Sequence, residues 1–152
     1  MSLATSCEYS QDVANDIRAS MQKHAGVFRT QASMDEGVRQ IAAIRERVGA
    51  IELKDKSRVF NTARVEALEV ENLIECAEAT IVSAAARREC RGAHTVYDYE
   101  RPTDDPVAPM GRDDANWMKH TLWYSEDNRL AYKSVNLKPL TVDSVPPKVR
   151  TF

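Results

Sequence analysis

The sequence predicts a mainly α-helical fold, an up-down-up bundle of three helices followed by a long loop, a short helix, a small β-hairpin and an extended tail. Apolar residues recur at helical spacing through the first two-thirds of the chain, whereas prolines and two short β-type segments follow residue 94. The 152 residues are enough for one domain with an appendage. We therefore expect a bundle over residues 1–94 and a C-terminal extension over residues 95–152, packed on the bundle or on another domain.

The first two helices are predicted from apolar stripes and from residues that begin helices. Ser10 can cap a first helix over residues 11–25. Ser33 and Glu36 have the spacing of a capping box at the start of a second helix, over residues 33–49. The stripes consist of Val13, Ile17 and Met21 in the first helix and of Met34, Val38, Ile41 and Val48 in the second.

The third helix has the strongest pattern in the chain. Its apolar positions are spaced alternately three and four residues apart, as in the seam of a helix that packs lengthwise on its partners. Leu68 and Leu73 widen this stripe, which indicates more than one neighbouring helix. A helix of about 30 residues would be roughly 45 Å long. The seam consists of Phe60, Ala63, Ala67, Val70, Ile74, Ala77, Ile81 and Ala84.

Beyond the third helix the pattern becomes irregular. Three prolines in residues 95–112 predict a loop. Asp113 or Asp114 can then cap a short helix. Residues 122–124 and 130–135 flank a Ser-Glu-Asp-Asn turn and predict a hairpin. Because a lone hairpin is marginally stable in water, it must pack on another part of the protein.

The composition argues against several function classes. The 21 Lys and Arg residues nearly balance the 23 Asp and Glu residues, unlike the basic surface of a nucleic-acid-binding protein. The five glycines are scattered, so this chain cannot form the usual glycine-rich dinucleotide or phosphate loops. No apolar run approaches 18 residues and no secretory signal is evident, so we expect no direct membrane insertion. Three cysteines without framework spacing are typical of a reducing compartment.

No set of residues forms a recognisable catalytic, cofactor-binding or metal site. Cys90 and His94 are four residues apart, but no second Cys/His pair supplies the remaining ligands of a structural zinc site, so no metal is expected. Cys76, on the third helix, is interpreted as a small core residue. The remaining polar candidates, interpreted as a helix cap and surface charges, are Asp113, Asp114, Lys119 and His120.

The end of the third helix is rich in cations. We interpret Arg87 and Arg88 as stabilised by the negative end of the helix dipole and by solvent. Arg91 differs, because Gly92 ends the helix and places a guanidinium and the His94 imidazole on one turn. Such a guanidinium can bind a carboxylate or backbone carbonyls at an interface, or belong to an ordinary helix end.

Several segments of the chain stand in the order of one family's landmarks. Residues 87–94 read R-R-E-C-R-G-A-H, residues 112–122 read R-D-D-A-N-W-M-K-H-T-L, and residues 146–152 read P-P-K-V-R-T-F. These segments resemble the R-x-E-S-R-G-A-H, R-D-D-x-x-W-[ML]-K-H-[TS]-L and P-P-x-x-R-x-[YF] motifs of the domain that closes the flavoprotein subunit of succinate dehydrogenase and fumarate reductase. The resemblance extends to residues 21–22, 26–29, 60–69 and 72–74.

The resemblance implies a parent enzyme that oxidises succinate to fumarate on covalently bound FAD and passes electrons to an iron-sulfur subunit. None of the family's flavin-binding, substrate-binding or proton-transfer residues maps onto this chain, so we expect a catalytically silent, spectrin-like helical domain without its own cofactor. Its implied partners are the flavin-binding domain of the same subunit and the iron-sulfur subunit. Its implied location is cytoplasmic, peripheral to the inner membrane through the parent complex. Arg91 and His94 are our candidates for the contact with the flavin domain.

Two departures from the family pattern and several alternatives accompany this interpretation. Cys90 replaces the usual Ser, which weakens a hydrogen bond more than it alters packing. The loop over residues 100–111 is longer than usual.

The domain of a fumarate reductase shares these motifs and that of L-aspartate oxidase shares the E-S-R-G-x-H element, although we prefer succinate dehydrogenase. Alternatives from other classes are an autonomous helical interaction module and a thiol or metal redox protein based on Cys90 and His94.

Overall fold

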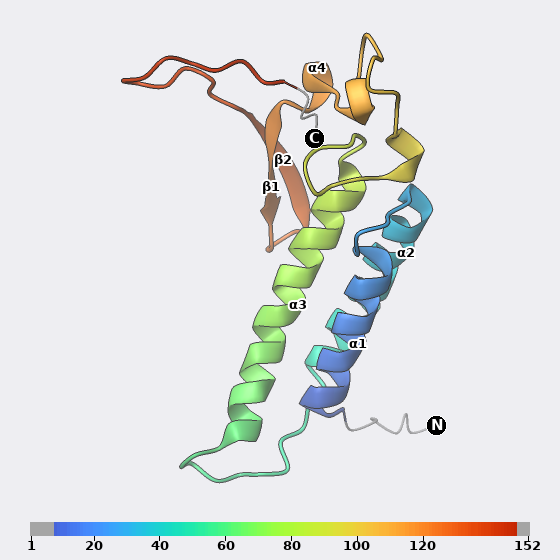
Figure 1. The fold of residues 1–152 in the computed structure, drawn as a ribbon. Helices are drawn as coiled ribbons and strands as arrows, with labels where there is room; N and C mark the ends of the chain where they lie inside the picture. Colours follow the sequence, from blue (N-terminus) through green and yellow to red (C-terminus); the bar gives the residue numbers. More distant parts are fainter. Residues whose placement is uncertain (1–7, 149–152) are drawn as a thin grey trace.

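A computed structural model describes residues 8–148 of the chain. Three long helices come first, and two 3₁₀ turns, one short helix and a two-stranded hairpin follow them (Figure 1). The elements are α1 (Ser10–His24), α2 (Gln31–Val48), α3 (Thr62–Ala86), the 3₁₀ turns η1 (Tyr97–Tyr99) and η2 (Pro109–Gly111), α4 (Asp114–Trp117), β1 (Lys119–Tyr124) and β2 (Arg129–Ser134). The predicted order of elements is confirmed.

The three long helices form an up-down-up bundle in which every helix packs on the other two. The connections over residues 25–30 and 49–61 reverse the chain, so that consecutive helices run antiparallel. The apolar stripes predicted from the sequence meet along the bundle axis. The buried residues of this core are Val13, Ala14, Ile17, Met34, Ile41, Ile44, Val70, Ile74, Ala77, Ile81, Ala84 and Val96.

Helices α1 and α2 begin earlier than predicted. The N-cap of α1 is Tyr9, without a side-chain capping bond, so the proposed Ser10 cap is wrong. The N-cap of α2 is Thr30, whose hydroxyl accepts a hydrogen bond from the Ser33 backbone N–H at 3.1 Å. The predicted capping box that begins at Ser33 is therefore wrong, because Thr30 supplies the same kind of cap one turn earlier.

Helix α3 is shorter than the predicted seam. Asn61 caps it by accepting a bond from the Arg64 N–H at 2.8 Å, so Phe60 lies before the helix and is 97% exposed rather than in the core. The last five seam residues, from Val70 to Ala84, are buried as predicted. The prediction for Cys76 is wrong: it is exposed, because a helical advance of about 100° per residue turns it away from the buried side of α3.

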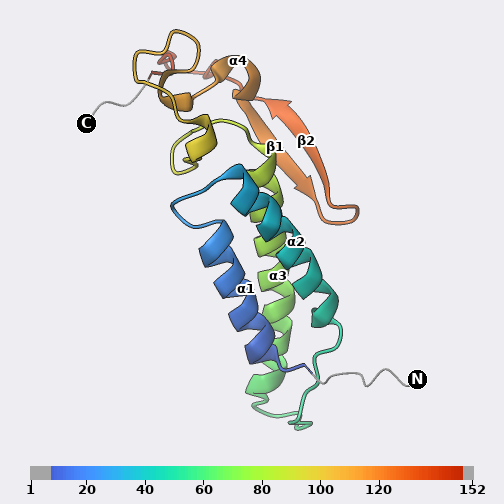
Figure 2. The same ribbon diagram turned by 90° about the vertical axis from the view of Figure 1, so that its right-hand side faces the viewer.

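The C-terminal extension covers the end of the bundle at which α3 finishes (Figure 2). Strands β1 and β2 pair antiparallel in a register that places Leu122 opposite Ala131. The hairpin lies along the C-terminal half of α3, and the Asn128 side chain at its turn donates to the Glu78 carboxylate at 3.2 Å. This contact supplies the packing partner that an isolated hairpin needs. No helix within residues 8–148 has both the length and the apolar character to cross a membrane.

Candidate functional site

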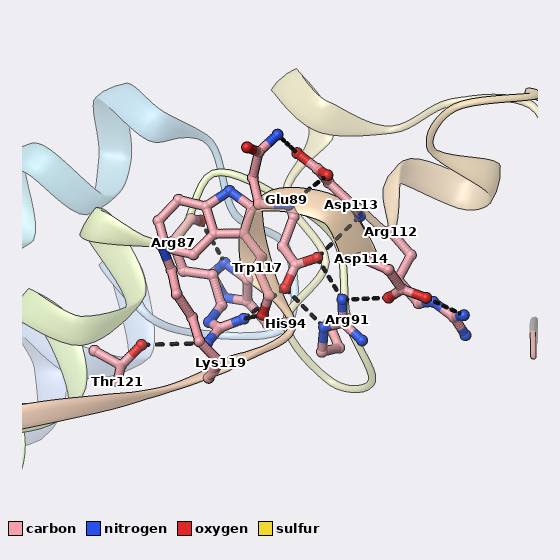
Figure 3. A network of polar contacts seen from close by, with 11 residues as sticks. Arg87, Glu89, Arg91, His94, Arg112, Asp113, Asp114, Trp117, Lys119 and Thr121 are labelled. Atoms are coloured by element: carbon pink, nitrogen blue, oxygen red, sulfur yellow. Dashed lines mark hydrogen bonds and ion pairs between the residues drawn. The ribbon is translucent and has the colours of Figure 1, made fainter. Parts of the chain in front are cut away.

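A polar network forms where α3 ends and meets α4 and β1 (Figure 3). The helix stops at Ala86, and its C-cap Arg87 adopts an extended backbone. Gly92 has a φ of 60°, a conformation that favours glycine, and the chain reverses there. Backbone bonds in both directions between Arg91 and His94 close the turn, at 2.8 and 3.0 Å. The structure therefore brings both sequence-predicted docking residues together on one tight turn.

Glu89 is the centre of this network. It is only 1% exposed, and four donors surround its carboxylate. One oxygen, Oε1, accepts from Arg87 Nη1 at 2.5 Å and from Arg91 Nε at 2.7 Å. The other, Oε2, accepts from Arg91 Nη2 at 2.9 Å and from the Asp113 backbone N–H at 3.0 Å. A buried carboxylate is stable only with such partners, so Glu89 joins the end of α3 to the segment before α4.

Arg87 ties the same carboxylate to strand β1. Its guanidinium donates to the backbone carbonyls of Trp117 and Lys119, at 3.1 and 2.7 Å, and to the Thr121 hydroxyl at 3.2 Å. It also lies 5.3 Å from the centre of the Trp117 ring, at cation–π distance. The prediction that Arg87 is a solvated residue at the helix dipole is therefore wrong, because its side chain is only 15% exposed and both of its Nη atoms donate hydrogen bonds.

Arg91 binds a carboxylate in bidentate fashion, and that carboxylate belongs to Glu89 of the same chain. Its Nη2 also donates to Asp114 at 2.7 Å, and Glu89 is the main cause of its raised pKa. Burial alone would raise the pKa of Asp114, but bonds from Arg112 and Arg91 outweigh burial and lower it. Arg112 also donates to the backbone carbonyl of Lys148 at 2.7 Å, which ties the tail to the network.

His94 connects the network to the loop between α1 and α2. Its Nδ1 lies 3.0 Å from Arg29 Nη1, and its Nε2 lies 3.0 Å from the Arg87 carbonyl oxygen. Arg29 also donates to the carbonyls of Gly26 and Ala25, at 2.7 and 2.9 Å. Burial, followed by the nearby cations, lowers the pKa of His94. A neutral imidazole with its proton on Nε2 satisfies both contacts, because it donates to the carbonyl and accepts from Arg29.

Cys90 and His94 contact different groups in the structure. The Cys90 thiol is buried and lies 3.4 Å from both the backbone oxygen and nitrogen of Val96, while burial raises its pKa. The His94 nitrogens are already occupied by Arg29 and Arg87. Within residues 8–148 no group of three or more His, Cys, Asp or Glu side chains is arranged to hold a metal ion. The thiol is protonated at neutral pH and packs as a small apolar group.

A cavity of about 800 Å³ opens beside the turn. Arg91, Gly92 and Ala93 line one side of it, and the long loop that follows η1 lines the other. Within this loop the Asp105 carboxylate accepts backbone bonds from Val107 and Ala108, at 2.9 and 2.8 Å, which order its chain. The turn of Arg91 is therefore open to solvent on the side that does not face Glu89.

The sequence analysis missed three members of the network, Glu89, Arg112 and Arg29. A usable signal was the position of Glu89, a single acidic residue that stands among arginines directly after the end of a helix. The predicted Asp113 cap is confirmed, because its carboxylate accepts from the Asn116 N–H at 3.1 Å. Asp114 is more than a surface charge, because it bridges Arg91 and Arg112.

Comparison with known proteins places this chain in a family. The family model described as "Fumarate reductase flavoprotein C-term" matches residues 14–152. The chain belongs to this family. The resemblance inferred from the motifs is thereby confirmed, although the last four residues of the tail motif, 149–152, lie outside the described residues.

Individual relatives carry the names of succinate dehydrogenase and fumarate reductase. The succinate dehydrogenase flavoprotein subunit of Coxiella burnetii is 44% identical over 135 residues, which cover 89% of this chain and 21% of that protein. The mitochondrial succinate dehydrogenase flavoprotein subunit of Oryza sativa is 40% identical over 141 residues, which cover 90% of this chain and 21% of that protein. A solved E. coli quinol fumarate reductase superposes with a TM-score of 0.75 at 29% identity, over 91% of this chain and 23% of that chain. The chain thus spans about a fifth of the length of the curated relatives that it matches.

Proposed function

We propose that the chain is the C-terminal helical domain of a succinate dehydrogenase flavoprotein subunit, and that it serves as a structural and docking domain. The parent would oxidise succinate to fumarate on FAD and pass electrons to an iron-sulfur subunit. The observation that carries the proposal is the family match over residues 14–152, combined with relatives about five times longer that are named for this enzyme. No residue of this chain takes part in the chemistry or holds FAD.

The structure supports a docking role because the buried Glu89 carboxylate is already bonded within the chain. The Glu89 network fixes the extension on the bundle, because its hydrogen bonds join the end of α3 to Asp113 and Lys119. Arg91 and His94 hold the turn from within, while Gly92 and Ala93 are exposed at its tip. We propose that this turn contacts the flavin-binding domain and that Arg91 and His94 act by fixing its shape.

The parent's remaining partners follow from the same proposal. The iron-sulfur subunit would accept the electrons, and membrane attachment would come through other subunits of the complex, on the cytoplasmic side of the inner membrane. A fumarate reductase remains the second candidate, because the solved structures at 29% and 31% identity are quinol fumarate reductases. The direction of the parent's reaction distinguishes the two candidates.

The proposal that the FAD-binding and catalytic residues lie outside this chain can be tested directly. The purified 152-residue chain is titrated with FAD and then assayed for succinate-dependent reduction of an acceptor dye. We expect no stoichiometric flavin binding and no dye reduction above the rate without protein. Either a bound flavin or succinate-dependent turnover by the chain alone would overturn the proposal that the catalytic residues lie elsewhere.

A further inference from the structure

An exposed apolar surface lies at the end of the bundle opposite the Glu89 network. It consists of Val59 and Phe60, in the connection before α3, and of Val65 and Leu68 in the first turns of α3, and we call it the Phe60 surface. The exposed fractions of these residues are 73%, 97%, 54% and 54%. Val65 and Leu68 are three positions apart and therefore neighbours on the helix surface. Large exposed apolar side chains that adjoin one another are typical of an interaction surface.

Phe60 is held outward at a conformational cost. Its φ of 50° lies in the left-handed region, which bulky residues rarely adopt. The neighbouring Asn61 side chain fixes this conformation, because it is buried and donates to the carbonyls of Asp55 and Ser57 at 3.0 and 2.8 Å. The same side chain caps α3. Strain that presents a large aromatic ring to solvent does not stabilise the isolated chain, and such strain is characteristic of functional positions.

A line of uncharged residues continues from this surface along α3. Asn72 and Cys76 follow Leu68 at successive intervals of four residues, and both are exposed. Charged side chains such as Glu69 and Glu75 flank this line. An apolar centre with a polar rim is the usual organisation of a protein interface, and a protruding aromatic residue is a common anchor in such interfaces.

The position of the N-terminal side of the chain indicates what covers this surface. The backbone of Glu8 pairs with Ile51 and accepts a bond from the Glu52 N–H at 3.0 Å, so the chain enters the bundle beside the connection that carries Phe60. Both lie at the same end of the bundle in Figure 1. The matched family is a C-terminal region, and this chain spans only 21% of the Coxiella burnetii relative, so most of a relative's polypeptide precedes the matched part.

We propose that the Phe60 surface is a docking site for the preceding, flavin-bearing part of the same subunit, which would cover Phe60 with an apolar pocket. This inference rests on the proposed function and adds a second contact, at the opposite end of the bundle from Arg91 and His94. The covered surface includes Val59, Phe60, Val65 and Leu68 and extends along α3 to Cys76. Because Cys76 lies on the outer line of this helix, its thiol reports directly on coverage.

The test uses a chimeric subunit in which this chain replaces the matching C-terminal region of the Coxiella burnetii flavoprotein subunit. Alkylation of Cys76 by iodoacetamide is followed by peptide mass spectrometry in the chimera and in the 152-residue chain. We expect alkylation at least about tenfold slower in the chimera. The matched control is Ala42→Cys in a Cys76→Ser background, which places the probe on the exposed side of α2 and is expected to react equally fast in both proteins.

A variant then tests the anchor. Phe60→Ser in the chimera is expected to restore at least half of the Cys76 reactivity of the free chain, whereas Leu140→Ser, at a fully exposed apolar residue of the tail, is expected to leave the protection intact. A chimera that oxidises succinate but alkylates Cys76 as fast as the free chain overturns the Phe60 surface alone. A folded chimera that neither binds FAD nor oxidises succinate contradicts the proposed function, and this inference with it.

Discussion

Glu89 offers the sharpest test of how the C-terminal extension is held on the bundle. In Glu89→Gln the side chain keeps its size, but one of its two acceptor oxygens becomes an NH₂ group. Each oxygen of Glu89 accepts two bonds, so either orientation of the amide leaves two donors facing another donor. The Arg87 guanidinium also loses its only ion-pair partner among the described residues. Arg91 keeps a second ion-pair partner, Asp114.

Breaking a buried ion pair by removing one partner typically costs about 3–5 kcal/mol. A domain of this size is stable by only about 5–15 kcal/mol, so Glu89→Gln removes a large share of the free energy that holds the extension. Both tryptophans of the chain, Trp117 and Trp123, lie in this extension. Urea unfolding followed by tryptophan fluorescence therefore reports on the extension, and circular dichroism at 222 nm reports mainly on the bundle. The fluorescence transition is expected to shift to lower urea by more than the circular dichroism transition.

The control is Glu36→Gln, which breaks an exposed pair between Glu36 and Arg39. Exposed pairs of this kind contribute about 0.2–1 kcal/mol, so this variant is expected to unfold nearly as the parent chain does. If Glu89→Gln unfolds within about 0.5 kcal/mol of Glu36→Gln by fluorescence, the network does not hold the extension and the reasoning from its contacts is refuted.

Two further predictions concern His94 and Gly111. Burial lowers the pKa of His94 below 6.5, so as the pH falls the unfolded chain binds a proton at this residue before the folded chain does. The stability due to neutral His94 is therefore complete above about pH 6.5 and is lost as the pH falls through the pKa of the folded state. In a plot of the urea unfolding midpoint against pH, His94→Gln should flatten the slope below pH 6.5. An unchanged slope would contradict this prediction. Gly111 has a φ of 79°, and a Cβ there would collide with the Tyr99 carbonyl, so Gly111→Ala should cost at least about 1 kcal/mol. Gly49→Ala, with a φ of −67° and open space, should be neutral or slightly stabilising, and equal effects of the two changes would refute the clash.

The architecture could be predicted from the sequence because each long apolar stripe depends on many residues at once. The α3 seam from Val70 to Ala84 is buried as predicted, and the hairpin forms where its two segments were expected. Single positions were less predictable. Thr30 and Ser33 are both residue types that cap helices well, and in the structure Thr30 is the cap. Cys76 belongs to neither the seam nor its flank, so its exposure depends on which side of α3 faces the other helices.

The candidate site was predictable only in part, because its contacts join residues far apart in the chain. The sequence left open whether Arg91 binds a carboxylate or backbone carbonyls at an interface or belongs to an ordinary helix end. In the structure it binds the carboxylate of Glu89, two residues away. Arg87 donates to groups 30 to 34 residues later, and His94 meets Arg29 at a separation of 65. No local pattern specifies such pairs, since they form only when the extension and the loop between α1 and α2 both meet the residues that follow α3.

The most direct test of the central claim is the succinate-dependent reduction of an acceptor dye by the chimeric Coxiella burnetii subunit that carries this chain as its C-terminal region. We expect the chimera to bind FAD and to turn over succinate at a rate within about tenfold of the natural subunit, and we expect no activity from this chain alone. A chimera that folds and binds FAD but does not turn over succinate would contradict the assignment to a succinate dehydrogenase.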